Sequence, residues 1–360
     1  MEGKRTIYSI KLKNILSFGS EEQEIELEPL NVLIGPNASG KSNLIEMFRL
    51  LRALPSNPSQ AIREGGGVSE WLWKGGGPAP IALIELQTSQ TAYRLEFTQV
   101  GYRWEITNER ITESGHPTLI NTNNQPDASL LATRDSSLQA QSHVSSLAET
   151  LSSIGIYKEW DTGRYSKLRL PQRPDLPGRP LLEDLSNFGL VFNNLPYRVK
   201  QEIAEQLTQV YDGVQEVITQ IDGGTVQTFI QEKGLSSPTS LARASDGTLR
   251  FLFSLTLLNQ PELPPLICID EPDAGLHPDV VHTVAELLIE ASKRTQIIVT
   301  THSDILVSAL SELPESVVVC ERDEWGTSLR RLDPDQLKLW LEKYTLGDLW
   351  RRGDLGGTRW

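Results

Sequence analysis

Long apolar runs, cysteine and an excess of positive charge are all lacking or scarce in this 360-residue sequence. No run approaches the roughly 18–20 apolar residues of a membrane-spanning helix, and the opening residues MEGKRTIYSIK lack the apolar block of a signal peptide. We therefore expect a cytoplasmic protein with no membrane partner. The two cysteines, Cys268 and Cys320, both fall within apolar strand-like patterns. This predicts two small buried side chains in a reducing compartment, and no metal site is readable.

Basic runs and heptad repeats are also missing. The formal net charge is −13, and nonspecific binding to duplex nucleic acid depends on Lys and Arg side chains that neutralise phosphates. The composition therefore argues against a large duplex-binding face, although a local groove in a dimer stays open. Because residues 110–240 show no sustained heptads, a long coiled coil is excluded there.

The most informative segment that is present is GPNASGKS at residues 35–42. Two glycines five positions apart, followed by lysine and serine, have the spacing of a phosphate-binding loop. The apolar run at 30–34 predicts the strand before it, and the pattern at 44–54 predicts an amphipathic helix after it. Glycine lets backbone N–H groups turn inward around anionic oxygens, and the helix N-terminus adds its positive dipole end. A bound nucleotide phosphate is therefore predicted.

Each residue type in this loop suits a chemical task. Lys41 supplies a mobile charge for the β- and γ-phosphates, and Ser42 supplies a hydroxyl for Mg²⁺. Nucleotide contacts are predicted for the loop and the residue after it: Gly35, Pro36, Asn37, Ala38, Ser39, Gly40, Lys41, Ser42 and Asn43.

Two further apolar runs end in ionisable residues. LICIDEP at 266–272 reads as a central parallel strand that ends in two carboxylates. Asp270 is predicted to hold Mg²⁺, and Glu271 to polarise the water that attacks the γ-phosphate. IIVTTHS at 297–303 places His302 at a strand end, where open α/β sheets bind ligands. Lys41, Glu271 and His302 are the predicted catalytic residues, whereas His277 stays open between a contact across a dimer and a structural role.

A second helix start with anion-binding character lies at Ser245, Asp246 and Gly247, before the apolar run FLFSLTLL. It offers free N–H groups and a serine hydroxyl. One mononucleotide site does not need two such helix ends. We therefore expect these three residues to contact the nucleotide of a neighbouring subunit.

Four regions are expected along the chain. Residues 1–110 form a first lobe with the phosphate loop and antiparallel strands. Residues 111–180 form a flexible or helical insertion and a Pro-rich connector. Residues 181–335 form a second lobe of alternating strands and helices, and residues 336–360 form a C-terminal helix and tail.

The tail is unusually rich in tryptophan, with Trp340, Trp350 and Trp360. Exposed Trp and Arg are favoured at interfaces, so two alternatives stay open: the tail folds back on its own subunit, or it docks a partner. The second alternative predicts that removal of residues 346–360 leaves ATP binding intact and abolishes a pull-down of the partner.

Together, these motifs resemble those of ABC-type ATPase heads of the SMC, RecF and OLD group, and most of all stand-alone AAA-family ATPases with a serine-aspartate-glycine signature. The resemblance covers about residues 1–110 and 180–335. It implies a two-lobed α/β fold, with a mixed and largely parallel phosphate-loop sheet, helices and an antiparallel β subdomain. By motif, residues 35–42 match Walker A, 245–247 the signature, 270–271 Walker B, 274–277 the D-loop and His302 the switch histidine. Asn14 and Ser17-Phe18 match an opening strand that lies near the nucleotide.

Some residues depart from the pattern of the family. Ala244 stands where a leucine is usual, and Thr248 stands where transporter heads carry glutamine. His277 replaces the D-loop aspartate of SMC and transporter heads. For the Q-loop glutamine, Gln87 is only a weak candidate.

The resemblance implies an ATP- and Mg²⁺-dependent hydrolase that forms a homodimer around ATP and acts as a nucleotide-gated switch. Antiphage defence or DNA metabolism is the implied setting, with a separate effector such as a Toprim-type nuclease, and DNA as a further candidate partner. Alternatives are a RecF-like DNA repair ATPase and, against the departures above, an ATPase subunit of a transporter.

Overall fold

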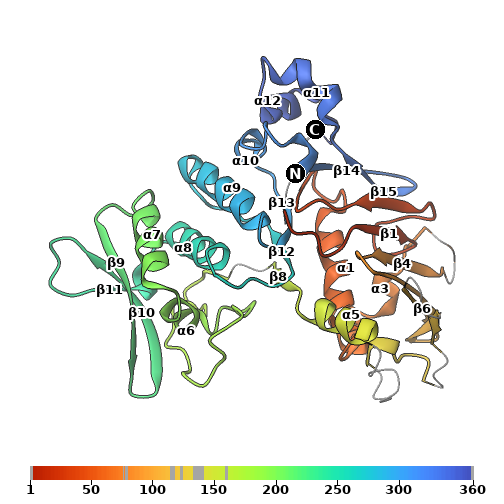
Figure 1. Cartoon of the computed structure of the whole chain (residues 1–360), viewed down its shortest axis with the longest axis horizontal. Coiled ribbons are helices and arrows are strands. Elements are labelled where there is room, and N and C mark those ends of the chain that lie inside the picture. The colour runs from red at the N-terminus through yellow and green to blue at the C-terminus, as the bar shows by residue number, and fades with distance from the viewer. Residues whose placement is uncertain are drawn as a thin grey trace.

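A central sheet with helices on both faces organises the molecule (Figure 1). The computed structural model describes residues 3–75, 77, 80–113, 118–121, 125–132, 142–158 and 161–357. Residues 114–117, 122–124 and 133–141 of the polar stretch predicted as a flexible insertion, together with Trp360, lie outside these described residues.

Within the described residues, the central sheet has six strands in the order β15-β14-β3-β13-β12-β8. All neighbours pair in parallel except β14 and β15, which form an antiparallel hairpin at one edge. The strands are β3 (Leu30–Ile34), β8 (Gly155–Tyr157), β12 (Leu266–Asp270), β13 (Gln296–Thr300), β14 (Val317–Asp323) and β15 (Gly326–Arg331). The sequence analysis did not predict β8, which takes the edge position beside β12.

Both faces of this sheet are covered, as apolar runs in parallel strands predict. Strands β3 and β13 are buried at every position. Because successive side chains point to opposite faces, Ile297 and Val299 join one apolar core and Ile298 joins the other. The first core also contains residues of α8 (Asp246–Leu258) and α9 (Pro278–Ser292), and the second contains residues of α1 (Lys41–Ala53).

The two cysteines lie in this sheet. Cys268 and Cys320 are free and buried, which confirms the prediction of small buried side chains. Burial raises the pKa of the Cys320 thiol to about 12, and it raises the pKa of the Cys268 thiol well above the ordinary range. Neither thiol is therefore a reactive nucleophile at neutral pH.

An antiparallel sheet forms the predicted β subdomain beside α1. Its strand order is β2-β1-β4-β5-β6-β7. The strands are β1 (Ser9–Lys13), β2 (Gln23–Glu26), β4 (Ala82–Gln87), β5 (Thr91–Val100), β6 (Arg103–Glu113) and β7 (Leu119–Ile120). Short helices surround this sheet: α2 (Pro58–Glu64), α3 (Val68–Trp71), η1 (Leu130–Ala132) and α5 (Ser142–Ser152).

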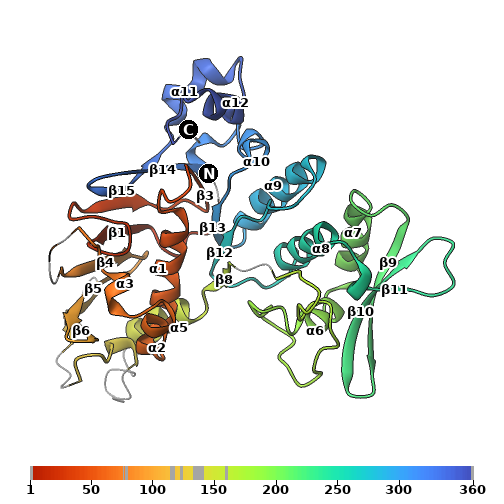
Figure 2. The same cartoon turned by 180° about the vertical axis from the view of Figure 1, so that it is seen from behind.

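On the other side of the central sheet, α8 packs against α7 and α9. Here a three-stranded antiparallel sheet, in the order β11-β10-β9, packs against α6 and α7. The elements are α6 (Phe188–Asn193), α7 (Tyr197–Leu207), β9 (Val214–Asp222), β10 (Thr225–Glu232), β11 (Thr239–Ser240) and η2 (Leu241–Arg243). Figures 1 and 2 both show α8 and α1 on opposite sides of β8 and β12.

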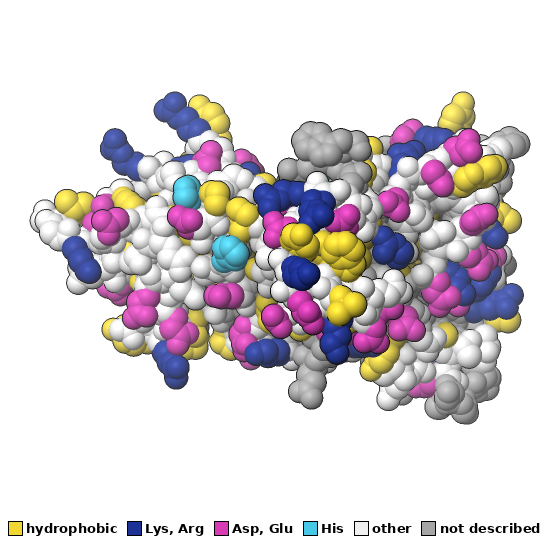
Figure 3. Space-filling view, turned by 90° about the horizontal axis from the view of Figure 1, so that it is seen from above, with side chains coloured by type: hydrophobic (Ala, Val, Ile, Leu, Met, Phe, Trp, Pro, Cys, Tyr) yellow, Lys and Arg dark blue, Asp and Glu magenta, His cyan; other side chains and the backbone are white. Residues whose placement is uncertain are grey.

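The C-terminal segment contains α10 (Asp304–Ser308), η3 (Pro314–Ser316), α11 (Pro334–Leu341) and α12 (Leu346–Arg352). Helix α12 packs on α10, and Trp350 is only 4% exposed. Residues 346–357 therefore fold back on their own subunit, which is the first of the two alternatives. Leu339 and Trp340 on α11 stay exposed, and Figure 3, which looks onto this end, shows hydrophobic side chains gathered among charged ones.

The predicted fold class is thus confirmed: a mixed α/β fold with a phosphate-loop sheet and an antiparallel β subdomain. Within the described part of the chain, no helix combines the length and apolar character that crossing a bilayer requires.

Candidate functional site

The phosphate loop connects the carboxyl end of β3 to α1, and its backbone has the geometry that glycine permits. Gly35, Ala38 and Gly40 have φ of 148°, 62° and 104°. A Cβ at Gly40 would lie 2.3 Å from the Thr327 hydroxyl oxygen, and one at Gly35 would lie 2.2 Å from the Cys320 carbonyl oxygen. Larger side chains are therefore excluded at both glycines by backbone angle and by space.

The N-terminus of α1 suits an anion. It has no capping side chain and no acidic residue in its first turn. By contrast, α8, α9, α10, α11 and α12 each have a side-chain cap and an aspartate in the first turn. The first N–H groups of α1 and its dipole are thus left for a ligand such as a phosphate.

Lys41 folds over the loop. Its Nζ donates to the carbonyl oxygens of Gly35 and Pro36, at 2.9 Å each, and the residue is 5% exposed. These neutral acceptors hold the ammonium at the mouth of the loop, and phosphate oxygens can replace them as stronger partners.

Oxygen ligands converge at the adjoining strand ends. Ser42 Oγ donates to Asp270 Oδ1 at 3.2 Å, and the Thr300 hydroxyl donates to the same carboxylate oxygen. Thr300 lies directly opposite Asp270 in the parallel pairing of β12 and β13. A hydroxyl oxygen and a carboxylate lying side by side fit Mg²⁺, which proteins bind through one or two carboxylates together with substrate phosphates.

Glu271 and His302 approach each other at the same edge. Glu271 Oε1 lies 3.5 Å from His302 Nε2, and the glutamate side chain is 46% exposed. The Glu271 backbone has φ of 48°, and its N–H donates to the carbonyl and hydroxyl oxygens of Thr300, at 3.1 Å each. A left-handed conformation at a non-glycine residue costs of order 1–3 kcal/mol. The two hydrogen bonds to Thr300 offset this cost and fix the backbone at Glu271.

The sequence analysis missed two hydroxyl residues that organise this site. Thr300 links Asp270 to Glu271, and Thr327 on β15 donates to the Ser39 carbonyl oxygen at 2.9 Å and to the Ser17 hydroxyl at 2.7 Å. Thr300 could have been found from the sequence, because it is one of two threonines directly before His302 and a hydroxyl at a strand end can hydrogen-bond to a neighbouring carboxylate. Thr327 gave no local signal, because it reaches the loop only through tertiary packing.

The signature segment caps α8 as predicted. Ser245 Oγ accepts from the Thr248 N–H at 3.1 Å, and the two hydroxyl oxygens lie 2.8 Å apart. A Cβ at Gly247 would lie 3.3 Å from the Gly275 carbonyl oxygen. The D-loop therefore packs beside the N-terminus of α8, while the phosphate loop lies across the central sheet on α1.

His277 has a capping role. It is the N-cap of α9, and its Nδ1 accepts from the Asp279 N–H at 3.4 Å. This is the structural alternative for His277; its 69% exposure leaves the side chain at the surface.

Gln87 is the weak candidate for the Q-loop glutamine. It ends β4 in the antiparallel sheet, and its side-chain amide donates to the Thr88 carbonyl oxygen. The residue that follows β8, next to β12 and Asp270, is Lys158. Its Nζ lies 3.2 Å from a Glu46 carboxylate oxygen. The role of Gln87 as the Q-loop residue stays a prediction.

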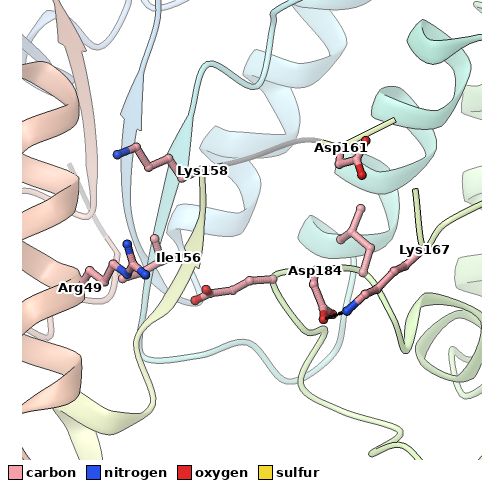
Figure 4. A pocket seen from close by; sticks show the side chains of 8 residues that line it. Arg49, Ile156, Lys158, Asp161, Lys167 and Asp184 are labelled. Atoms are coloured by element: carbon pink, nitrogen blue, oxygen red, sulfur yellow. Dashed lines mark hydrogen bonds and ion pairs between the residues drawn. The ribbon is translucent and has the colours of Figure 1, made fainter. Parts of the chain in front are cut away.

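A cavity of about 380 Å³ opens between α1, β8 and the segment 183–185 (Figure 4). Its basic residues Arg49, Lys158 and Lys167 all form ion pairs with carboxylates. This balance of charge gives no reason to assign it a ligand.

Comparisons with known proteins agree with this geometry. The family model described as "AAA domain, putative AbiEii toxin, Type IV TA system" matches residues 30–308. A search of curated proteins gave no match. The solved structure of an SMC head bound to the C-terminal winged-helix domain of ScpA is similar, with a TM-score of 0.56 at 16% identity, covering 93% of this chain and 100% of that one.

A second similar structure is the Smc head domain from Pyrococcus furiosus with an extended coiled coil, bound to the C-terminal domain of ScpA. Its TM-score is 0.52 at 15% identity, covering 94% of this chain and 99% of that one. At such identities the likeness is one of fold, and the fold is that of an ABC-type ATPase head, as the motifs implied. Because the family model spans well over half of its length, the chain belongs to the family of AAA domains described as putative AbiEii toxins of type IV toxin–antitoxin systems.

Proposed function

We propose that this chain binds ATP with Mg²⁺ and hydrolyses it within a homodimer. Each ATP lies between the phosphate loop of one subunit and the Ser245-Asp246-Gly247 segment of the other. The observation that carries this proposal is the separation of α1 and α8 on opposite sides of β8 and β12 (Figures 1 and 2). One subunit keeps its phosphate loop and its signature segment on opposite sides of these strands, whereas two subunits can bring them to the same phosphate.

Roles follow from the contacts at the strand edge. Lys41 exchanges its two carbonyl acceptors for the β- and γ-phosphates. Ser42 and Asp270 would hold Mg²⁺, which supplies positive charge to the phosphate oxygens. Glu271 accepts a proton from the attacking water. His302 positions the Glu271 carboxylate relative to the γ-phosphate.

The ATP cycle acts as a switch. The γ-phosphate satisfies helix ends from both subunits, so ATP favours the closed dimer and hydrolysis weakens the contact between subunits. We place this switch in antiphage defence or DNA metabolism, with a separate effector protein. The family description, which names a putative toxin, favours defence, and the ScpA-bound SMC heads show that this fold can carry a partner chain.

Replacement of Lys41 by alanine is expected to abolish ATP binding, because the loop loses the ammonium that donates to two of its carbonyl oxygens. Binding of a fluorescent ATP analogue measures this. Lys293→Ala is the matched control, because Lys293 is exposed at the C-cap of α9 and pairs only with Glu290 in the described ion pairs. Equal affinity in the Lys41→Ala protein would contradict the site.

Replacement of Ser245 by arginine tests the second half of the site. The large cation at the start of α8 should prevent ATP-driven dimerisation and turnover while the ATP affinity of the monomer stays within about twofold. Light scattering after size exclusion, with and without ATP, measures the dimer. Ser89→Arg, in the exposed turn between β4 and β5, is the control. Normal dimerisation and turnover of Ser245→Arg would overturn the shared site.

A further inference from the structure

Arg169 forms hydrogen bonds to the backbone just before α8. Its Nη1 donates to the carbonyl oxygens of Ala242 at 3.1 Å and Ala244 at 2.7 Å, and its Nη2 donates to Asp246 Oδ1 at 2.6 Å. The Arg169 side chain is 9% exposed although it comes from an irregular segment. A planar guanidinium with several fixed donors is suited to hold such a set of acceptors in one geometry.

The same side chain also bonds to the segment that follows β8. Its Nε donates to the Thr162 carbonyl oxygen at 2.8 Å. Thr162 belongs to the segment that follows β8, the strand beside Asp270. Arg169 therefore connects the chain that leaves the catalytic edge with the loop that starts α8.

Charge gives a reason for this contact. Asp246 is the first residue of α8, and its side chain is 66% exposed. A carboxylate there stabilises the free helix, but it repels a phosphate brought to the same N–H groups. The phosphate-binding end of α1 has no such acid in its first turn. An anion can approach α8 closely only if the charge of Asp246 is offset, and Arg169 supplies that positive charge at hydrogen-bond distance.

We propose that Arg169 is a positioning residue for ATP turnover. It fixes the backbone from Ala242 to Asp246 and offsets the Asp246 carboxylate, so that the start of α8 can meet the γ-phosphate held by the other subunit. This inference rests on the proposed function, because it needs a nucleotide shared between subunits. Arg169 does not act on its own subunit's phosphate loop, and this distinction makes the proposal testable.

The first experiment compares Arg169→Ala with Arg173→Ala in the full chain. Arg173 is a matched control, because it is exposed on the same segment and pairs with Asp175. Arg169→Ala should lower kcat about tenfold or more while the ATP affinity of the monomer changes less than about twofold, as loss of a charged hydrogen bond predicts. Arg173→Ala should match the parent. A parent-like kcat in Arg169→Ala, or an equal loss in both variants, would overturn the assignment.

A second variant separates charge from folding. Adding Asp246→Asn to Arg169→Ala removes the uncompensated carboxylate and should recover part of the lost kcat, whereas a purely structural role predicts no recovery. Melting curves are recorded for all variants. If Arg169→Ala does not fold, Arg169→Lys replaces it, because lysine keeps the charge but lacks the fork of donors. A fold-competent Arg169→Lys with a kcat well below that of the parent would support the fixed set of guanidinium donors, and one with parent kcat and parent dimerisation would overturn that part of the proposal.

Mixed dimers decide where Arg169 acts. In a dimer of one Lys41→Ala and one Arg169→Ala subunit, one site combines an intact phosphate loop with an intact signature. The mixture should therefore exceed the summed activity of its components. A Lys41→Ala and Ser245→Arg mixture is the reference. If only the reference gains activity, the Arg169 assignment fails; if neither mixture gains, the shared site of the proposed function fails.

Discussion

A Glu271→Gln variant is expected to hydrolyse ATP at least about a hundredfold more slowly than the parent, while ATP still drives it into a dimer. Glutamine keeps the size of the side chain and can still hydrogen-bond to the water. It cannot accept the proton that the water loses. The backbone N–H of residue 271 keeps its contacts with Thr300, so the substitution leaves the strand end in place.

The measurement has two parts. Phosphate release in a single turnover reports hydrolysis, and light scattering reports the dimer that accumulates when hydrolysis stops. Glu262→Gln is the control, because Glu262 is 73% exposed and its ion pair is with Arg179. A Glu271→Gln protein that releases phosphate at the parent rate would remove Glu271 as the proton acceptor. A variant that is slow but strictly monomeric with ATP would instead contradict the shared site.

The phosphate loop and the strand ends could be predicted from the sequence because their chemistry is local. Gly35, Gly40 and Lys41 need only the right spacing between a strand and a helix, and parallel strands bring Asp270 and His302 to one edge whatever the details of packing. The family comparison confirms the kind of fold that these motifs imply. The individual roles of these residues, and the division of the chain into four regions, stay predictions.

Contacts made through tertiary packing could not be predicted in this way. Arg169 lies more than seventy positions before Asp246 and carries no motif. Thr327 braces the phosphate loop from a strand far along the chain. The position of β8 depends on a three-residue strand that has too few residues for a recognisable pattern.

The C-terminal arm also makes contacts that the sequence did not predict. Residues Gly353–Gly357 follow α12 and lie against the back of the phosphate loop, because a Cβ at Gly357 would be 3.4 Å from Gly35 Cα. Two hydrogen bonds fix the arm there. Trp350 Nε1 donates to the Gly357 carbonyl oxygen at 2.8 Å, and the Gly357 N–H donates to Glu321 Oε1 at 2.8 Å. The tail therefore packs beside Gly35 of the phosphate loop.

A chain that ends at Thr345 is consequently expected to lose both stability and ATP binding, contrary to the partner-docking alternative for the tail. It loses four buried side chains, those of Leu346, Leu349, Trp350 and Leu355. Loss of one such side chain costs about 2–5 kcal/mol, so losing all four is comparable with the stability of a whole domain. Thermal melting and analogue binding measure the outcome, and a stable truncated protein with parent affinity would contradict it.

A point substitution tests the contact between the arm and the phosphate loop without removing the buried side chains of α12. Gly357→Ala keeps α12 but places a Cβ 2.8 Å from Val319 Cγ1 and against Gly35. Gly223→Ala is a matched control, because φ is 55° at Gly223 and 58° at Gly357, yet nothing lies within 4 Å of a Cβ at Gly223. The two positions have similar φ, and only Gly357→Ala crowds a neighbour, Val319 on β14, so that the arm must shift from its place beside the phosphate loop. We expect ATP affinity to fall about three- to tenfold in Gly357→Ala, which corresponds to about 1 kcal/mol, and to stay unchanged in Gly223→Ala. Equal affinities in the two variants would show that the arm packs against the loop without shaping it.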